Sequence, residues 1–201
     1  DILVKDVYNK ISSHFNNIRV QKWSWITEYL NNLQKNSIVL DLGCGTGRNM
    51  LYPNINFIGI DNCENFIKIC KLKNLSVIEG DMCNIPLKND SIDNIISIAS
   101  FHHLISNLRR NQCLQEIYRV LKKNGTVLLS VWSFYQPPKT RRQFPKYGDT
   151  IVNWNKFGKV FERYYYIFRI NEIKNLFILN NFEIINHKWD CGNEIFILKK
   201  K

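Results

Sequence analysis

Seven apolar runs of strand length recur along this chain, separated by more polar segments. They occupy residues 37–43, 57–61, 75–81, 92–100, 126–133, 182–189 and 194–199. Several runs are apolar at consecutive positions rather than at alternate ones, which is typical of strands buried on both faces of a parallel sheet. The pattern therefore predicts a mostly parallel, seven-stranded sheet.

Between these runs lie segments whose apolar residues recur at helical spacing. They cover residues 62–73, 106–122 and 171–180. An alternation of strands and helices predicts an α/β fold with a doubly wound sheet. The last two runs are joined only by the turn sequence DCGN, which is too short for a parallel crossover, so an antiparallel hairpin should end the sheet.

A chain of 201 residues buries roughly 70% of the surface that its unfolded form exposes, which is enough for one core. We therefore expect a single domain, residues 1–201. Its parts are an N-terminal helical extension, a cofactor-binding core, a substrate-side insertion, and a C-terminal helix with hairpin, at residues 1–36, 37–133, 134–170 and 171–201.

The charge of the chain favours a polyanionic partner. It has 28 Lys and Arg residues against 17 Asp and Glu residues, a formal net charge of +11. Such a surplus is expected of proteins that bind nucleic acid, although basic enzymes without such a partner exist.

The six cysteines include no C-x-x-C pair, so we expect neither a metal site nor a disulfide framework. Free thiols are typical of the reducing cytoplasm or nucleus, where we expect the protein to be located. No run approaches the roughly 18 apolar residues that cross a bilayer, so we expect no membrane partner.

A glycine-rich turn, GCGTG at residues 43–47, follows the first strand directly. Glycines at this place let backbone N–H groups approach a ligand closely, at the N-terminus of the helix that should follow. Acidic residues lie near or at the ends of the first three strands, at Asp41, Asp61 and Asp81. Asp61 lies about 20 residues after the turn, where an acidic side chain can accept hydrogen bonds from ribose hydroxyls.

This series resembles the class I S-adenosylmethionine-dependent methyltransferases, which have a Rossmann-like fold, over roughly residues 37–133. The resemblance implies that S-adenosylmethionine is the cofactor. Its binding residues would be Gly43, Gly45 and Gly47 at the methionine end, Asp61 at the ribose, and Asp81 with Met82 at the adenine, together with Asp41 and Ala99. A dinucleotide is disfavoured because the turn lacks the G-x-G-x-x-G spacing, and acidic residues suit a cationic sulfonium better than a pyrophosphate.

In such a fold the end of the fourth strand borders the transferred methyl group, which places His102 and His103 where substrate meets cofactor. Successive strand residues point to opposite faces, so we expect one of the two to enter the pocket while the other packs. The sequence does not decide which. A histidine pair here is also seen in small-molecule methyltransferases.

Two arginines follow in the next helix. Arg110 lies seven residues before Ile117 on nearly the same face, so we expect it to overhang the site. A cation in the first turn works against the helix dipole, which an anionic ligand would offset. A solvated helix surface is the alternative, more so for Arg109 than for Arg110.

Sequence elements along nearly the whole chain resemble the eukaryotic tRNA wobble-uridine methyltransferases. These elements are YNKISSHFNNIR (8–19), Trp23, SIASFHH (97–103), LRR (108–110), VLLSVWS (127–133), NWNKF (153–157), ERYYYIF (162–168) and GNEIFILKK (192–200). The resemblance implies that the enzyme esterifies 5-carboxymethyluridine in the tRNA anticodon to 5-methoxycarbonylmethyluridine. It also implies a heterodimer with a small zinc-binding activator protein, and the third strand, as the outer edge of the sheet, is apolar enough to need cover.

A carboxylate is ionised at neutral pH, so attack on a methyl group needs no general base. Candidate donors that hold the substrate carboxylate are His14, Arg19, His102 or His103, Arg110 and Arg163. Candidates for stacking on the flipped base are Tyr8, Trp132 and Tyr164. Lys139, Arg141 and Arg142 are candidates for phosphate contacts.

Each of these assignments has a structural alternative. His14 also suits a polar position beside the amphipathic stripe of the N-terminal segment, ERYYYIF suits a packed aromatic strand, and the basic segment suits a solvated loop. The chain departs from the family pattern at His-His-Leu-Ile-Ser-Asn and at Asn153-Trp154. The alternative functions are a class I methyltransferase of a small acid or quinone, and a catalytically silent RNA-binding subunit.

Overall fold

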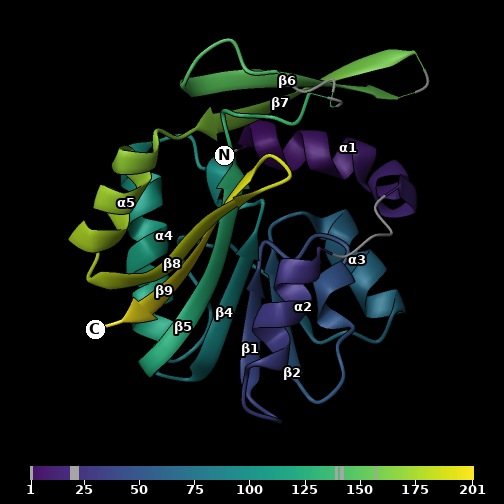
Figure 1. Ribbon diagram of the computed structural model, residues 1–201. Helices are drawn as coiled ribbons and strands as arrows, with labels where there is room; N and C mark the ends of the chain where they lie inside the picture. The colour runs from purple at the N-terminus through teal and green to yellow at the C-terminus, as the bar shows by residue number, and fades with distance from the viewer. Residues whose placement is uncertain (1, 19–22, 139, 141–142, 157) are drawn as a thin grey trace.

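The structure is a computed structural model that describes residues 2–18, 23–138, 140, 143–156 and 158–201, without the side chains of residues 2, 3, 13–18 and 156. A seven-stranded sheet forms its centre, in the order β3-β2-β1-β4-β5-β9-β8 (Figure 1). The strands are β1 (Ile38–Leu42), β2 (Asn56–Asp61), β3 (Val77–Glu79), β4 (Ile92–Ile98), β5 (Leu121–Trp132), β8 (Phe182–Asp190) and β9 (Asn193–Lys200).

The apolar runs form the strands that the sequence predicts. The first five strands are parallel, with Leu40 of β1 opposite Ile58 of β2 and Ile95 of β4. β9 pairs antiparallel with both β5 and β8, which confirms the C-terminal hairpin. Leu40 and Ile95 are fully buried because helices cover both faces of the sheet.

Each face of the sheet has its own hydrophobic core. α4 (Asn107–Val120) and α5 (Ile170–Leu179) cover one face through residues such as Ile117 and Phe177. α2 (Ser24–Asn31) covers the other face through Trp25 and Ile26. α3 (Glu64–Leu72) packs beside β2 and β3. No helix in the described part of the chain is long and apolar enough to cross a membrane.

A further layer lies over the carboxyl ends of the parallel strands (Figure 1). It consists of α1 (Ile2–Ile18) and a separate two-stranded antiparallel sheet, β6 (Gly148–Lys156) and β7 (Lys159–Ile167). The insertion is therefore a hairpin that packs on α1, and its β7 buries alternate residues Arg163, Tyr165 and Ile167.

The segment after β1 differs from the expectation. Residues 43–55, all described, contain only a three-residue 3-10 helix, η1 (Arg48–Met50), and no α-helix. A second short helix, η2 (Phe101–His103), follows β4.

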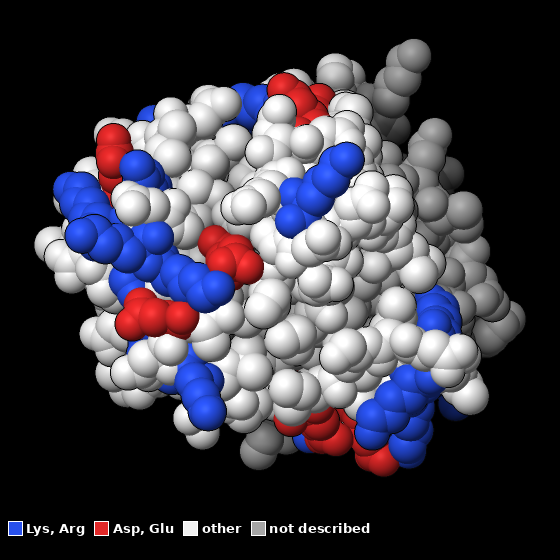
Figure 2. Space-filling model, turned by 90° about the horizontal axis from the view of Figure 1, so that it is seen from below, with Lys and Arg blue, Asp and Glu red and all other residues white. Residues whose placement is uncertain are grey.

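Basic and acidic side chains are mixed on the face that lies away from α1 and the hairpin. Figure 2 shows this face, with Lys and Arg gathered mainly on one side and Asp and Glu among them. Near the start of β5, Lys122 pairs with Asp93 at 2.7 Å, and near the end of β9, Lys200 pairs with Asp90 at 2.6 Å. The surplus positive charge is thus partly neutralised here.

Candidate functional site

A pocket opens at the carboxyl ends of β1, β2 and β4, beneath α1. Its lining comes from α1, the turn after β1, the residues after β2, β3 and β4, and the first turn of α4. Of the eight predicted cofactor-binding residues, six line it: Gly43, Gly45, Asp61, Asp81, Met82 and Ala99. Asp41 and Gly47 do not.

The turn after β1 is held tightly against β2. The N–H groups of Gly43 and Cys44 both donate to the carbonyl of Ile60, at 2.8 and 3.0 Å. Gly43 has φ +79°, and a Cβ there would lie 2.5 Å from the Cβ of Ser100. Gly45 has φ +54° and would meet no protein atom within 4 Å, because it faces the open pocket.

Gly47 has a packing role instead of the predicted contact with the cofactor. It has φ +72°, and a Cβ there would lie 2.3 Å from Cδ1 of Leu75 and 3.1 Å from Sγ of Cys70. Its N–H donates to the carbonyl of Cys44 at 3.0 Å, which closes the turn. Glycine is needed here because the residue packs against the segment around α3.

The carboxylate of Asp61 braces the turn from below. Its Oδ2 accepts the N–H of Gly45 at 2.8 Å, and its Oδ1 accepts the N–H of Cys63 at 2.9 Å. Burial raises the pKa of Asp61, and these backbone donors oppose that rise. The N–H of Asn62 also interacts with this carboxylate, and the acceptor capacity that remains suits a ligand hydroxyl.

Asp41 lies behind the pocket wall rather than in it. It is 1% exposed, and its Oδ2 has no hydrogen-bond partner in the structure as described. Burial, and then the charge of Asp61, raise its pKa to about 7, while Arg48 opposes the rise. Asp41 therefore does not line the pocket, and its contact with the cofactor stays a prediction.

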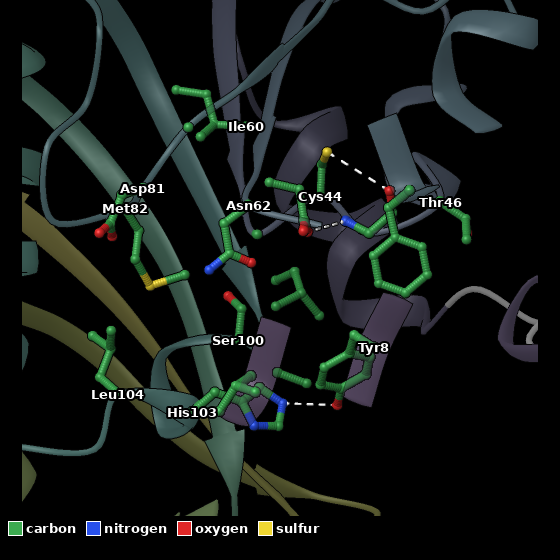
Figure 3. A pocket seen from close by; sticks show the side chains of 18 of the residues that line it. Tyr8, Cys44, Thr46, Ile60, Asn62, Asp81, Met82, Ser100, His103 and Leu104 are labelled. Atoms are coloured by element: carbon green, nitrogen blue, oxygen red, sulfur yellow. Dashed lines mark hydrogen bonds between the residues drawn. The ribbon is translucent and has the colours of Figure 1, made fainter. Parts of the chain in front are cut away.

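Asp81 forms one end of the pocket together with Met82 (Figure 3). Its Oδ1 accepts the N–H of Cys83 at 2.9 Å, and both its oxygens accept from Nη2 of Arg109. Arg109 also lines the pocket. Arg109 is therefore not the solvated helix residue that was the alternative for it, and the sequence signal for its position was the acidic residue that ends a neighbouring strand.

His103, not His102, faces the pocket. Its Nε2 lies 2.9 Å from the hydroxyl of Tyr8, so α1 and η2 meet at this point (Figure 3). Its Nδ1 lies 2.8 Å from the carbonyl of Tyr164. His102 is fully buried, and its Nδ1 accepts the N–H of Trp132 at 3.0 Å. One histidine therefore lines the pocket and the other supports β5.

Next to His103 lies an aromatic stack. The rings of Trp132 and Tyr165 are parallel, 4.0 Å apart, and the Tyr165 ring is 4.4 Å from that of His103. Trp132 is buried and does not line the pocket, so in this structure it is not open for base stacking. Tyr164 points to the other side of β7, where its hydroxyl donates to Asp149 and thus also lies away from the pocket.

Arg163 is buried behind this stack. It is 4% exposed, and its guanidinium carbon lies 4.6 Å from the Trp154 ring centre, 5.3 Å from Tyr165 and 5.9 Å from Trp132. In the structure as described, its Nε and Nη1 have no hydrogen-bond partner. A buried guanidinium with unused donors is costly unless something accepts from it.

Arg110 is a structural residue, contrary to the prediction that it faces the site. Its Nε donates to the carbonyl of Leu104 at 3.1 Å, its Nη1 to Asn107 at 2.7 Å, and its Nη2 to Ile105 at 3.3 Å. Its guanidinium lies 3.5 Å from the ring centre of Tyr166. Two carbonyls just before α4 bind this cation and draw it away from the pocket.

Five other predicted residues cannot be placed. Arg19, Lys139, Arg141 and Arg142 lie outside the described residues, as does the side chain of His14, whose backbone belongs to α1. No group of three or more metal-ligating side chains occurs among the residues that are described.

Residues 40–129 match a family model described as a methyltransferase domain. The chain is 40% identical over 134 residues to a tRNA (carboxymethyluridine(34)-5-O)-methyltransferase of Arabidopsis thaliana, covering 66% of this chain but only 33% of that protein. It is 31% identical over 220 residues to the protein of the same name from Schizosaccharomyces pombe, covering 98% of this chain and 96% of that one.

A solved complex between the Trm112 methyltransferase activator of Haloferax volcanii and a methyltransferase is also similar. It has a TM-score of 0.72 and 15% identity, and covers 98% of this chain and 96% of that one. At this level of identity the likeness shows the fold alone.

Proposed function

The chain belongs to the family of tRNA (carboxymethyluridine(34)-5-O)-methyltransferases, and from this premise we propose that it methylates the carboxylate of 5-carboxymethyluridine at the wobble position of tRNA. The observation that carries the proposal is the match to the Schizosaccharomyces pombe relative, because it extends over 98% of this chain. It therefore includes α1 and the β6–β7 hairpin, which lie outside the methyltransferase domain model at residues 40–129.

S-adenosylmethionine is the cofactor, and when bound it supplies the methyl group on a sulfonium. The pocket fits it: Asp61 has spare acceptor positions for the ribose, Asp81 offers an acceptor for the adenine, and Gly45 leaves space for the methionine end. The carboxylates also suit a cationic ligand.

The wall formed by His103 and Tyr8 positions the reactants. The carbonyl of Tyr164 only accepts, so Nδ1 of His103 carries a hydrogen, and in the neutral ring Nε2 accepts from the Tyr8 hydroxyl. No base is needed because the substrate carboxylate is already ionised. These residues act by holding α1 closed over the reacting groups, which raises the effective concentration of the nucleophile.

The guanidinium of Arg163 suits the substrate carboxylate, but it is 4% exposed and does not line the pocket, so it reaches the substrate only if the Trp132–Tyr165 stack moves aside. It is one aromatic ring away from His103, through Tyr165, and its Nε and Nη1 have no acceptor in the structure as described. A planar guanidinium binds a carboxylate through two parallel hydrogen bonds. The surrounding aromatic rings exclude water and so strengthen that interaction.

The proposed macromolecular partners are tRNA and a Trm112-type zinc-binding activator. The net charge of +11 supports the first. The second is supported by β3, which forms the outer edge of the sheet, so backbone groups on its outer side can pair with a strand of another chain. The six free cysteines support a reducing compartment, the cytoplasm or the nucleus.

The test is transfer of labelled methyl to tRNA that carries 5-carboxymethyluridine, by the chain co-purified with its activator. We expect a base-labile methyl ester, and tRNA affinity that falls steeply with salt. His103→Ala and Arg163→Ala should lower the rate of methyl transfer. The control His187→Ala should not, because it removes a histidine of β8 that contacts Glu194 of β9. Methylation of a small acid or quinone in place of tRNA would contradict the proposal.

A further inference from the structure

We propose that Arg109 holds Asp81 in the one orientation that lets the pocket accept a 6-aminopurine and reject a 6-oxopurine, which makes it a specificity-determining positioning residue. The inference rests on the proposed function, since it concerns the purine end of the same pocket.

The contact between the two residues is unusually restrictive. Nη2 of Arg109 donates to Oδ1 of Asp81 at 2.7 Å and to Oδ2 at 2.6 Å. The N–H of Cys83 donates to Oδ1 at 2.9 Å. The carboxylate thus accepts hydrogen bonds from α4 on one side and from the loop after β3 on the other. It cannot rotate without breaking a short hydrogen bond.

Counting acceptor positions shows what remains for a ligand. A carboxylate has about four lone-pair positions, two on each oxygen. Oδ1 uses both, for Arg109 and Cys83, whereas Oδ2 uses one, for Arg109. A single acceptor position on Oδ2 is left, and it can be filled only by a donor such as an exocyclic amino group.

The position of Arg109 in its helix indicates a role beyond helix stability. It lies in the first turn of α4, where its N–H donates to the Ser106 cap at 3.2 Å. A cation is unfavourable at this end of a helix. Its side chain is 28% exposed and that of Asp81 is 41% exposed, so solvent screens the pair and its contribution to stability is small. Orientation of Asp81 is what the contact provides.

The charge state of Asp81 follows from the same contacts. Partial burial raises the pKa of Asp81, but Arg109 and the Cys83 N–H outweigh that effect and hold the pKa below its usual value. The other titratable groups that act on this pair are the amino terminus of the chain, whose charge also lowers the pKa of Asp81, and the thiols of Cys83 and of Cys113 on α4. An ionised Asp81 is acceptor-only, so a 6-oxopurine would place one acceptor against another.

The experiment measures binding of S-adenosylhomocysteine and S-inosylhomocysteine by calorimetry, using the chain co-purified with its activator. Wild type should prefer the adenosyl compound by roughly tenfold to a hundredfold, the range expected for one hydrogen bond to a charged group. In Arg109→Met the preference should fall to within about threefold, because Asp81 can then turn away. Arg109→Lys should be intermediate, since it keeps the charge but not the planar donor.

The matched control is Lys122→Met. Lys122 pairs with Asp93, which also accepts the N–H of Ile38 at 2.7 Å, so the pair is built in the same way but is remote from the pocket. This variant should keep the wild-type preference. A second readout is pH: as the pH falls, the residual adenosyl preference of Arg109→Met should be lost at a higher pH than the preference of wild type, because the pKa of Asp81 rises once the guanidinium is gone.

Two results would overturn the inference. A folded Arg109→Met variant that keeps the wild-type preference would show that Asp81 needs no positioning, and an equal loss of both ligands would indicate a purely structural ion pair. If the wild-type complex binds neither ligand, the proposed function fails as well, so the two failures are distinguishable.

Discussion

Gly45 and Gly47 of the GCGTG turn have different roles, and alanine substitutions should distinguish a role in cofactor binding from a role in packing. Gly47→Ala adds a Cβ 2.3 Å from Cδ1 of Leu75, at φ +72°. Gly45→Ala adds a Cβ to open pocket at φ +54°. Gly148→Ala, at φ +86° outside the pocket with its nearest atom 4.0 Å away, is a control for backbone strain alone.

The expected costs follow from these geometries. Left-handed backbone costs an alanine about 1–2 kcal/mol, which is the whole cost at Gly148. At Gly47 overpacking adds about 1–3 kcal/mol, so the free energy of unfolding should fall by about 2–5 kcal/mol. In Gly45→Ala the free energy of unfolding should fall only by the cost of the left-handed backbone. Cofactor binding should weaken, because the added methyl group occupies space that the ligand needs.

Urea unfolding measures the stabilities, and calorimetry with S-adenosylhomocysteine measures the affinities. Gly47→Ala should bind the ligand like wild type when folded, whereas Gly45→Ala should bind it at least about fivefold more weakly, as an overpacking cost of about 1–3 kcal/mol implies. If Gly45→Ala bound normally while Gly47→Ala lost affinity, the assignment of the two glycines would be reversed and the reasoning refuted.

Three further predictions follow from single side chains. Tyr8→Phe removes the hydroxyl 2.9 Å from Nε2 of His103, so methyl transfer should slow by about 2- to 13-fold in single-turnover assays, and an unchanged rate would show that this contact does not hold α1 closed. Asp41 keeps its proton in the fold up to about pH 7 but loses it near pH 4 when unfolded. The stabilisation that comes from keeping this proton is therefore present below about pH 4 and lost as pH rises towards 7. The free energy of unfolding of wild type, measured in urea, should fall by about 4 kcal/mol over that range relative to Asp41→Asn. Parallel plots of this free energy against pH would contradict the prediction. Arg110→Met leaves the buried carbonyl of Leu104 without its donor and should destabilise the fold by about 1–3 kcal/mol, while the folded variant binds S-adenosylhomocysteine normally. Lost affinity at unchanged stability would restore Arg110 to the site.

Strands were predictable from the sequence because burial on both faces requires consecutive apolar residues, such as Ile38, Val39 and Leu40 of β1. The edge where ligands bind was predictable for the same reason, since parallel strands bring Asp61 and Asp81 to one side. The α-helix expected after β1 was not found. The turn there continues into η1, and this segment lacks the apolar periodicity that favours an α-helix.

Side-chain direction at the site was not predictable to the same degree. His102 and His103 are adjacent, and only the packing of β5 and α1 decides which one is buried. Arg109 and Arg110 differ by one position, or about 100° around a helix, and each is drawn to the nearest acceptor. Those acceptors are Asp81 for Arg109, 28 residues earlier in the chain, and for Arg110 the nearby carbonyls of the loop before α4. Every residue has a carbonyl, so the sequence does not show which of them accepts.

The buried guanidinium of Arg163 has a consequence for turnover. Esterification converts an anion into a neutral group, so the product no longer offers the charge that a guanidinium binds best. A hydrogen bond to a charged partner contributes about 1.5–3 kcal/mol, compared with about 1 kcal/mol for a neutral one. Under the proposed function, Nε and Nη1 would meet an ester instead of a carboxylate after the reaction, so the finished nucleotide should bind less tightly than the unfinished one. The proposed reaction would thereby promote release of the modified tRNA.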